Sequence, residues 1–175
     1  METLQIREAT EGDAEGLVLF MARLANEGLP VLFKGMAVPS VDEERDFVRR
    51  FRKPQDGVCL VAVDGETVVG VLDFHREKRA QVAHGGEFGM SVDREYRRQG
   101  VGTALLRALI AWARAEAVTR LQLQVFENNR PAIGLYESMG FQTEGRRRGA
   151  VVVAGTPIDV LLMARIADIS EAHAR

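Results

Sequence analysis

A glycine turn between two apolar runs is the most informative stretch of the chain. Gly100 and Gly102 follow two adjacent arginines, Arg97 and Arg98, and precede apolar residues at helical spacing. A strand that turns through glycines into a helix presents backbone N–H groups at the positive end of the helix dipole. Together with the arginines, such groups bind phosphates well. The turn therefore predicts a site for a phosphorylated cofactor.

Two common phosphate-binding patterns fit this turn poorly. A Walker-type loop needs a lysine after its last glycine, where this chain has Thr103. A dinucleotide-binding fingerprint needs glycine or alanine three residues after the second glycine, where this chain has Leu105. Glu127 could still mimic the ribose-binding acid, so an NAD-binding oxidoreductase stays a minor alternative. The glycines could also serve backbone conformation alone.

The elements around the turn can be predicted from apolar spacing. Residues 88–92 indicate a strand, residues 93–99 a charged turn, and the residues just after Gly102 the start of an amphipathic helix. Arg107 and Arg114 lie off the apolar stripe and should face water. The stripe itself consists of Leu105, Leu106, Leu109, Ile110 and Ala113.

The segment before the turn predicts strands and two capped helices. Thr10 with Asp13, and Ser40 with Glu43, have the composition of helix N-termini. Asp64-Gly65 between apolar runs predicts a tight β-hairpin. The predicted elements are a strand at 4–9, helices at 14–24 and 41–52, and hairpin strands at 58–63 and 67–74.

The C-terminal part predicts one more strand, one helix and a strand pair. These are residues 121–126, the helix 131–138 stopped by Gly140, and strands from Phe141 and over 158–166 with a turn near Ala154-Gly155. The order β-α-α-β-β-β-α-β-α-β-β predicts an α/β fold, with helices flanking a mixed, mostly antiparallel twisted sheet. We expect one domain over residues 1–167 and a frayed tail over 168–175.

Bulk properties exclude several classes of protein. The chain has 175 residues, 46% hydrophobic residues and a net charge of −2, which gives no general attraction to nucleic acid or membranes. Cys59 is the only cysteine and lies in an apolar run, so no intrachain disulfide is expected. The three histidines, His75, His84 and His173, lack metal-ligand spacing, so no metal site is expected. Without an apolar signal core or a long apolar run, a cytoplasmic protein is predicted.

Two segments together resemble the GNAT superfamily of N-acetyltransferases. The run from Arg97 to Thr103 is similar to the family's acyl-CoA pyrophosphate loop, which has an Arg or Gln, two further residues, a Gly, one residue, and then a Gly or Ala. A second segment resembles the family pattern Asn-x-x-Ala-x-x-x-Tyr-x-x-x-Gly-Phe. It is carried by Asn129, Ala132, Tyr136, Gly140 and Phe141. The resemblance covers residues 87–166.

The resemblance implies a GNAT-like fold with acetyl-CoA as co-substrate. The pyrophosphate would be held by Arg97, Arg98, Gln99, Gly100, Val101, Gly102 and Thr103. Backbone groups of Met90, Ser91 and Val92 would pair with the pantetheine arm. Asn129, Ala132 and Tyr136 would contact the arm as well. Capping of the following helix is the alternative role for Asn129.

Two residues carry the chemistry that the resemblance implies. Tyr136 would donate a proton to the leaving thiolate; its alternative role is packing in the core beside Leu135 and Phe141. Glu87 is the candidate base for the attacking amine, and a solvated strand-end glutamate is the alternative. Asp73, His75 and Glu127 are further candidates for the base.

The predicted activity is direct acetyl transfer to an amine in a ternary complex. A small amine or amino acid is the favoured acceptor; protein N-termini or lysines are the alternative, and so is a non-catalytic acyl-CoA-binding module. Residues 146–148, all arginine, could bind an acceptor carboxylate or form a solvated strand edge. The apolar segment 26–40 could be a pocket wall or part of the core. Homodimerisation is possible.

Overall fold

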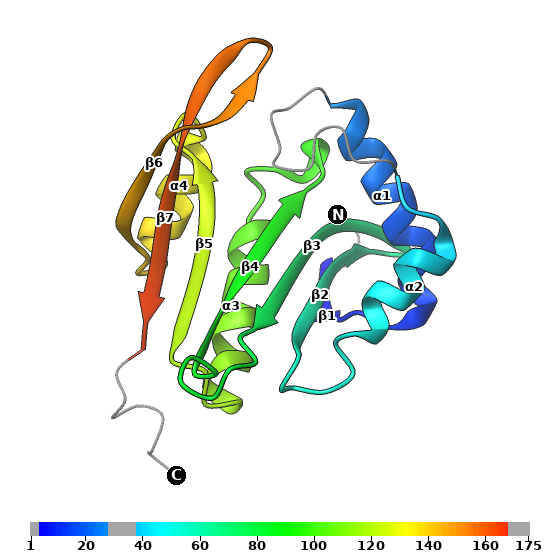
Figure 1. Cartoon of the computed structure of the whole chain (residues 1–175). Helices are drawn as coiled ribbons and strands as arrows, with labels where there is room; N and C mark the ends of the chain where they lie inside the picture. Colours follow the sequence, from blue (N-terminus) through cyan, green and yellow to red (C-terminus); the bar gives the residue numbers. More distant parts are fainter. Residues whose placement is uncertain (1–3, 28–37, 168–175) are drawn as a thin grey trace. The chain divides into compact units, whose positions relative to one another are not determined.

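Seven strands and four α-helices make up the part of the chain that the computed structural model describes, residues 4–27 and 38–167 (Figure 1). The elements are β1 Leu4–Glu8, α1 Ala14–Asn26, α2 Val41–Arg49, β2 Gly57–Asp64, β3 Thr67–Arg76, β4 Gly85–Val92, α3 Val101–Ala115, β5 Arg120–Phe126, α4 Arg130–Ser138, β6 Gln142–Val153 and β7 Thr156–Ile166. The predicted order of helices and strands is confirmed.

The strands form one sheet in the order β1-β2-β3-β4-β5-β7-β6. The pairs β1–β2, β5–β7 and β6–β7 are antiparallel, whereas β4–β5 is parallel. The predicted mixed, mostly antiparallel sheet is therefore confirmed. The contacts of the chain fall into two compact units, Met1–Phe74 with Met90–Ile110 and His75–Gly89 with Ala111–Arg175. The domain span 1–167 stays a prediction, and the tail 168–175 lies outside the described residues.

The core of the first unit forms where α1 and α2 pack on β2 and β3. Leu17 and Phe20 of α1 are fully buried against Val61 and Val68. Burial of such side chains stabilises the fold by about 1.5–3 kcal/mol each. Every residue of β2 from Gly57 to Val63 is buried, as its continuous apolar run indicates.

Both predicted helix caps of the first unit exist, with two corrections. Ser40 and Glu43 form a capping box, but α2 ends at Arg49 instead of Arg52. Thr10 and Asp13 also form a capping box, but around a short 3₁₀ turn, Glu11–Asp13, that precedes α1. This 3₁₀ turn contains the residues between the predicted cap, Thr10, and the predicted start of the helix, Ala14. Most of the apolar segment 26–40 lies outside the described residues.

The helix α3 begins two residues earlier than predicted. Gly100 has φ +87°, which ends the preceding turn, and α3 starts at Val101 with Gly102 inside its first turn. Leu105, Leu106 and Leu109 are fully buried, whereas Arg107 and Arg114 are exposed, as predicted. Only one of the two glycines therefore has a conformation that favours glycine.

Long antiparallel ladders dominate the second unit. β5 alternates between buried and half-buried residues and pairs with β7 from Arg120–Ile166 to Phe126–Val160. β6 lies at the edge of the sheet, and its register with β7 shifts around Glu144 and again between Arg147 and Val151. The predicted turn at 154–155 is confirmed, with positive φ at both residues.

Candidate functional site

The glycine turn in the first unit presents the start of α3. The Ala104 N–H donates to the carbonyl of Gly100, which closes the first turn of the helix. The N–H groups of Val101, Gly102 and Thr103 precede that bond, so by helix geometry they lack intrahelical acceptors. They remain at the positive end of the helix dipole. This arrangement suits an anion.

The two arginines of the turn have different surroundings. The Arg97 Nε donates to the Val92 carbonyl at 2.9 Å, and its guanidinium forms an ion pair with Glu27. The Glu27 side chain is only 9% exposed and also accepts from the Arg94 N–H at 3.1 Å. Arg98, with φ +60°, is exposed. Arg97 therefore braces the turn, while Arg98 faces solvent.

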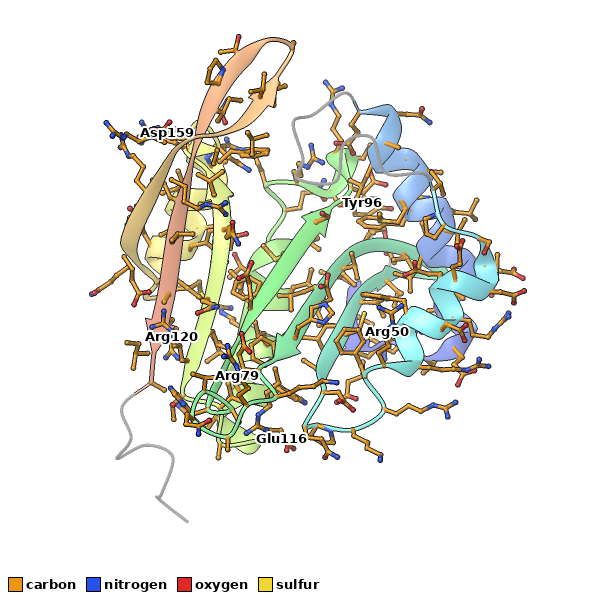
Figure 2. The ribbon with its side chains drawn as sticks, viewed as in Figure 1. Arg50, Arg79, Tyr96, Glu116, Arg120 and Asp159 are labelled. Carbon is orange, nitrogen blue, oxygen red and sulfur yellow. The ribbon has the colours of Figure 1, made fainter. Side chains whose placement is uncertain are left out.

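A second ion pair anchors the strand that leads into the turn. Asp93 is buried and accepts from the Arg23 Nε at 2.6 Å. The Asp93 N–H donates to the Val69 carbonyl at 2.9 Å, and Arg23 also donates to the Val68 carbonyl at 2.6 Å. Tyr96 lies in the 3₁₀ turn that follows (Figure 2). Sequence analysis missed Glu27, Arg23 and Asp93, because no local signal connects residues 70 positions apart.

Tyr136 lies in an aromatic cluster of the second unit. Its ring packs edge-on against Phe88 at 6.0 Å and against Phe141 at 5.9 Å between centroids. The residue is 6% exposed, and burial raises the pKa of Tyr136 to about 12. The hydroxyl therefore stays protonated at neutral pH and can act as a proton donor. Packing and proton donation are compatible at this position.

Glu87 lies on the opposite face of the sheet from Tyr136. Successive side chains of a strand point to opposite faces, and the next residue, Phe88, contacts Tyr136. Glu87 is half-buried, and its Oε1 accepts from the Gln124 Nε2 at 3.0 Å. The Oε1 of Gln124 accepts in turn from the Arg147 Nη1 at 3.1 Å. Sequence analysis did not single out Gln124, although it alternates with buried residues of β5.

The other predicted site residues have clear local roles. The Asn129 Oδ1 accepts from the Ala132 N–H at 3.3 Å, so Asn129 caps α4. Glu127 forms an ion pair with Arg146, which also lies 3.6 Å from Asp159 of β7 (Figure 2). The Glu127 carboxylate is therefore engaged with an arginine.

The remaining candidate residues lie on β2, β3 and β4. Asp73 is half-buried and His75 is exposed, and Met90, Ser91 and Val92 are half-buried. Cys59 is buried, and burial raises the pKa of its thiol. The thiol is therefore protonated at neutral pH, which makes it a poor nucleophile.

Neither a metal centre nor a membrane-spanning helix is found among the described residues. No three His, Cys, Asp or Glu side chains among residues 4–27 and 38–167 gather in a way that could hold a metal ion. In the same part of the chain, none of the helices has the length and apolar character needed to cross a bilayer.

Comparison with known families identifies the chain. The model of the acetyltransferase (GNAT) family matches residues 24–141, which include the glycine turn and the segment from Asn129 to Phe141. The chain belongs to this family. As a GNAT acetyltransferase it shares the fold of solved members, so the predicted family and enzyme class are confirmed.

Two relatives carry names that describe their substrates. The chain is 30% identical to L-amino acid N-acetyltransferase AaaT of Escherichia coli, over 95% of this chain and 99% of that protein. It is 40% identical to the ribosomal protein bS18 alanine N-acetyltransferase of the same organism, over 44% of this chain and 52% of that protein. The first match spans nearly the whole of both chains.

Two solved structures show the same fold. A GNAT acetyltransferase from Streptococcus pneumoniae matches with a TM-score of 0.88 and 30% identity, over 94% of this chain and 99% of that chain. YncA from Salmonella typhimurium, solved with its cofactor acetyl-CoA, matches with a TM-score of 0.83 and 19% identity, over 95% of each chain. The GNAT fold of this chain is thus shared over almost its full length.

Proposed function

We propose that this GNAT protein transfers the acetyl group of acetyl-CoA directly to the amine of a small molecule, and that this acceptor is an amino acid. The observation that carries the proposal is the buried Tyr136 side chain, whose burial raises its pKa to about 12, in a segment that matches the family. The near full-length match to an L-amino acid N-acetyltransferase supports the acceptor class. Family membership favours this reading over an NAD-binding oxidoreductase and over a non-catalytic binding module.

The residues allow each proton of the reaction to be followed. The acceptor nitrogen attacks the thioester carbonyl, an N–C bond forms, and the C–S bond breaks. Tyr136 gives its proton to the departing thiolate, and Glu87 accepts the proton that the amine loses, directly or through water. Because the two side chains lie on opposite faces of the sheet, the reacting carbonyl would have to lie between strands. Acid and base would then approach it from opposite sides.

The length of the strand ladders supports this placement. The ladder between β4 and β5 joins three residue pairs, Gly85–Arg120, Gly86–Leu121 and Glu87–Gln122, whereas β5 and β7 share seven pairs. Beyond Glu87 we propose that the backbone of Met90, Ser91 and Val92 pairs with the pantetheine arm. The pyrophosphate would bind to the N–H groups from Gly100 to Thr103, assisted by Arg97, Arg98 and Gln99. Asn129 and Ala132 would contact the arm at the start of α4.

A covalent acetyl-enzyme is not part of the proposal. Cys59 is buried and its thiol is protonated, so it lacks the thiolate that such an intermediate needs. The second candidate acceptor is a protein N-terminus, because one relative acetylates an alanine of a ribosomal protein. That match covers less than half of this chain, so the amino acid is preferred.

Thiol release from acetyl-CoA tests the proposal. Wild type and Tyr136→Phe would be assayed with amino acids, polyamines and peptide N-termini. We expect acceptor-dependent release that falls about 10²-fold or more in the variant, because the phenyl ring keeps the packing and loses the proton donor. Tyr96→Phe is the matched control, since Tyr96 is the only other tyrosine. Full activity of Tyr136→Phe would refute the role of this hydroxyl, and silence across the panel would refute the proposed acceptor.

A further inference from the structure

Three side chains from β4, β5 and β6 form a hydrogen-bonded row in the second unit, in which β7 lies between β5 and β6. The Gln124 amide donates to Glu87 and accepts from Arg147, with distances of 3.0 and 3.1 Å. Only one orientation of the amide satisfies both neighbours, because a flipped amide would point its N–H groups at the guanidinium. The amide of Gln124 therefore bridges the candidate base, Glu87, and the guanidinium of Arg147. They lie on the same face of the sheet.

Arg146 and Arg147 are neighbours in sequence but differ in their partners. Arg146 is paired with two carboxylates, Glu127 and Asp159. The partner of Arg147 within residues 4–27 and 38–167 is the neutral amide of Gln124, and no carboxylate in that part of the chain lies within ion-pair distance of it. Its charge is thus available for a ligand. A guanidinium fork binds a carboxylate with two parallel hydrogen bonds.

The backbone around Arg147 is held in place by its own hydrogen bonds. Arg147 is paired with Val160 in the β6–β7 ladder and directly precedes the register shift that ends at Val151. Within that shift, the Gly149 N–H donates to the Asp159 Oδ1 at 2.8 Å. The irregular segment is therefore closed by a charge-assisted bond. Arg147 projects from a fixed position at the edge strand.

We propose that Arg147 binds the carboxylate of the acceptor and so makes the enzyme selective for free amino acids. This inference rests on the proposed function and adds the residue that recognises the carboxylate of the acceptor. The Glu87 Oε1 and the Arg147 Nη1 are bonded to Gln124, which leaves the Glu87 Oε2 and the Arg147 Nη2 as the atoms that would contact the ligand. The α-amine of an amino acid would meet the first, and its carboxylate would meet the second.

An α-amino acid carries a hydrogen-bond donor and an acceptor on one short molecule, as the Gln124 amide does. Its amine suits the Glu87 carboxylate, and its carboxylate suits the Arg147 guanidinium. A peptide N-terminus offers the amine but no neighbouring carboxylate. A bound peptide N-terminus would leave the guanidinium of Arg147 without a carboxylate. The enzyme would therefore select against peptides, because this charge would stay unpaired.

The test compares L-amino acids with their α-carboxamides as acceptors. Wild type, Arg147→Gln and Arg146→Gln would be assayed for kcat/KM with saturating acetyl-CoA. Wild type should prefer the acid over the amide by roughly tenfold to a hundredfold, the range for hydrogen bonds to charged groups. Arg147→Gln should abolish that preference through a higher KM for the acid. Arg146→Gln should keep it. The amine of a carboxamide is less basic than the amine of the acid, so kcat/KM is calculated on the concentration of the unprotonated amine of each acceptor.

The outcomes separate this inference from the proposed function. An unchanged preference in Arg147→Gln, in a protein with the wild-type melting temperature, would overturn the inference. Equal use of acids, carboxamides and peptide N-termini by wild type would also overturn it, while acetyl transfer itself would stand. If no amine in the panel is acetylated, the proposed function fails, and the inference fails with it.

Discussion

Two regions of the molecule each hold adjacent arginines, two in the glycine turn and three on β6, and in each region two neighbours differ in their partners. In the glycine turn Arg97 is bound to Glu27 and Arg98 is exposed, while on β6 Arg146 is bound to carboxylates and Arg147 contacts only an amide among the described residues. In both pairs, one arginine holds the backbone and the other is available to a ligand. Adjacent residues of the same type therefore do not share a role.

The two regions also differ in what their backbone can offer. At the glycine turn the first N–H groups of α3 precede any helical acceptor, so the backbone itself can bind an anion. On β6, the residues before the register shift pair with β7 on one side only, because β6 is the edge strand of the sheet. The acceptor site proposed there depends on the Arg147 side chain, which donates to Gln124. Backbone N–H groups thus mark one region and a guanidinium marks the other.

The largest expected effect on stability comes from substituting the arginines of the glycine turn, which tests whether Arg97 and Arg98 have different roles. Arg97→Gln leaves the Glu27 carboxylate buried without its partner, which should lower the free energy of unfolding by about 2 kcal/mol after allowing for the partial exposure of Arg97. Arg98→Gln should leave stability unchanged and raise the KM for acetyl-CoA roughly tenfold. Thermal unfolding and steady-state kinetics measure both. Equal losses of stability in the two variants would contradict the different roles of Arg97 and Arg98.

Two glycine substitutions test whether the backbone of the turn contacts the cofactor. Gly100 and Gly155 have φ +87° and +81°, and nothing lies within 4 Å of an added Cβ at either position. Alanine at each should cost about 1–2 kcal/mol of stability through backbone strain alone. Gly100→Ala should in addition raise the KM for acetyl-CoA, since its methyl group would stand where the pyrophosphate approaches. An equal KM in both variants would place the cofactor elsewhere.

The smallest effect concerns an arginine–carboxylate pair remote from both regions. The Arg7 hydrogen bonds, helped by Thr10, lower the pKa of Asp13 from 3.8 to about 2. A depressed carboxyl pKa stabilises the folded state above about pH 4, and this contribution is lost as the pH falls toward 2. Because the Arg7 partner is 35% exposed, solvent screens the pair, and we expect on the order of 1 kcal/mol or less. Asp13→Asn should remove this slope from acid unfolding curves and leave kcat/KM at neutral pH unchanged.

Local patterns predicted most of the fold. The hairpin turn at Asp64-Gly65, the Ser40 capping box and the buried stripe of α3 all depend on residues a few positions apart. The errors lie at element ends, as at Val101 and Arg49. There a single φ angle or a few terminal hydrogen bonds decide where the helix begins or ends.

The order of elements, the GNAT family and the residues of its two motifs could be predicted from the sequence, because these depend on spacing along the chain. Which charges already have partners became clear from the folded chain. Glu27 meets Arg97 across 70 positions, and Gln124 meets Arg147 across 23. The opposite faces of Glu87 and Tyr136 also follow from packing. The partner of a charged side chain depends on distance in space, and residues at many different separations in the sequence can form the same kind of contact.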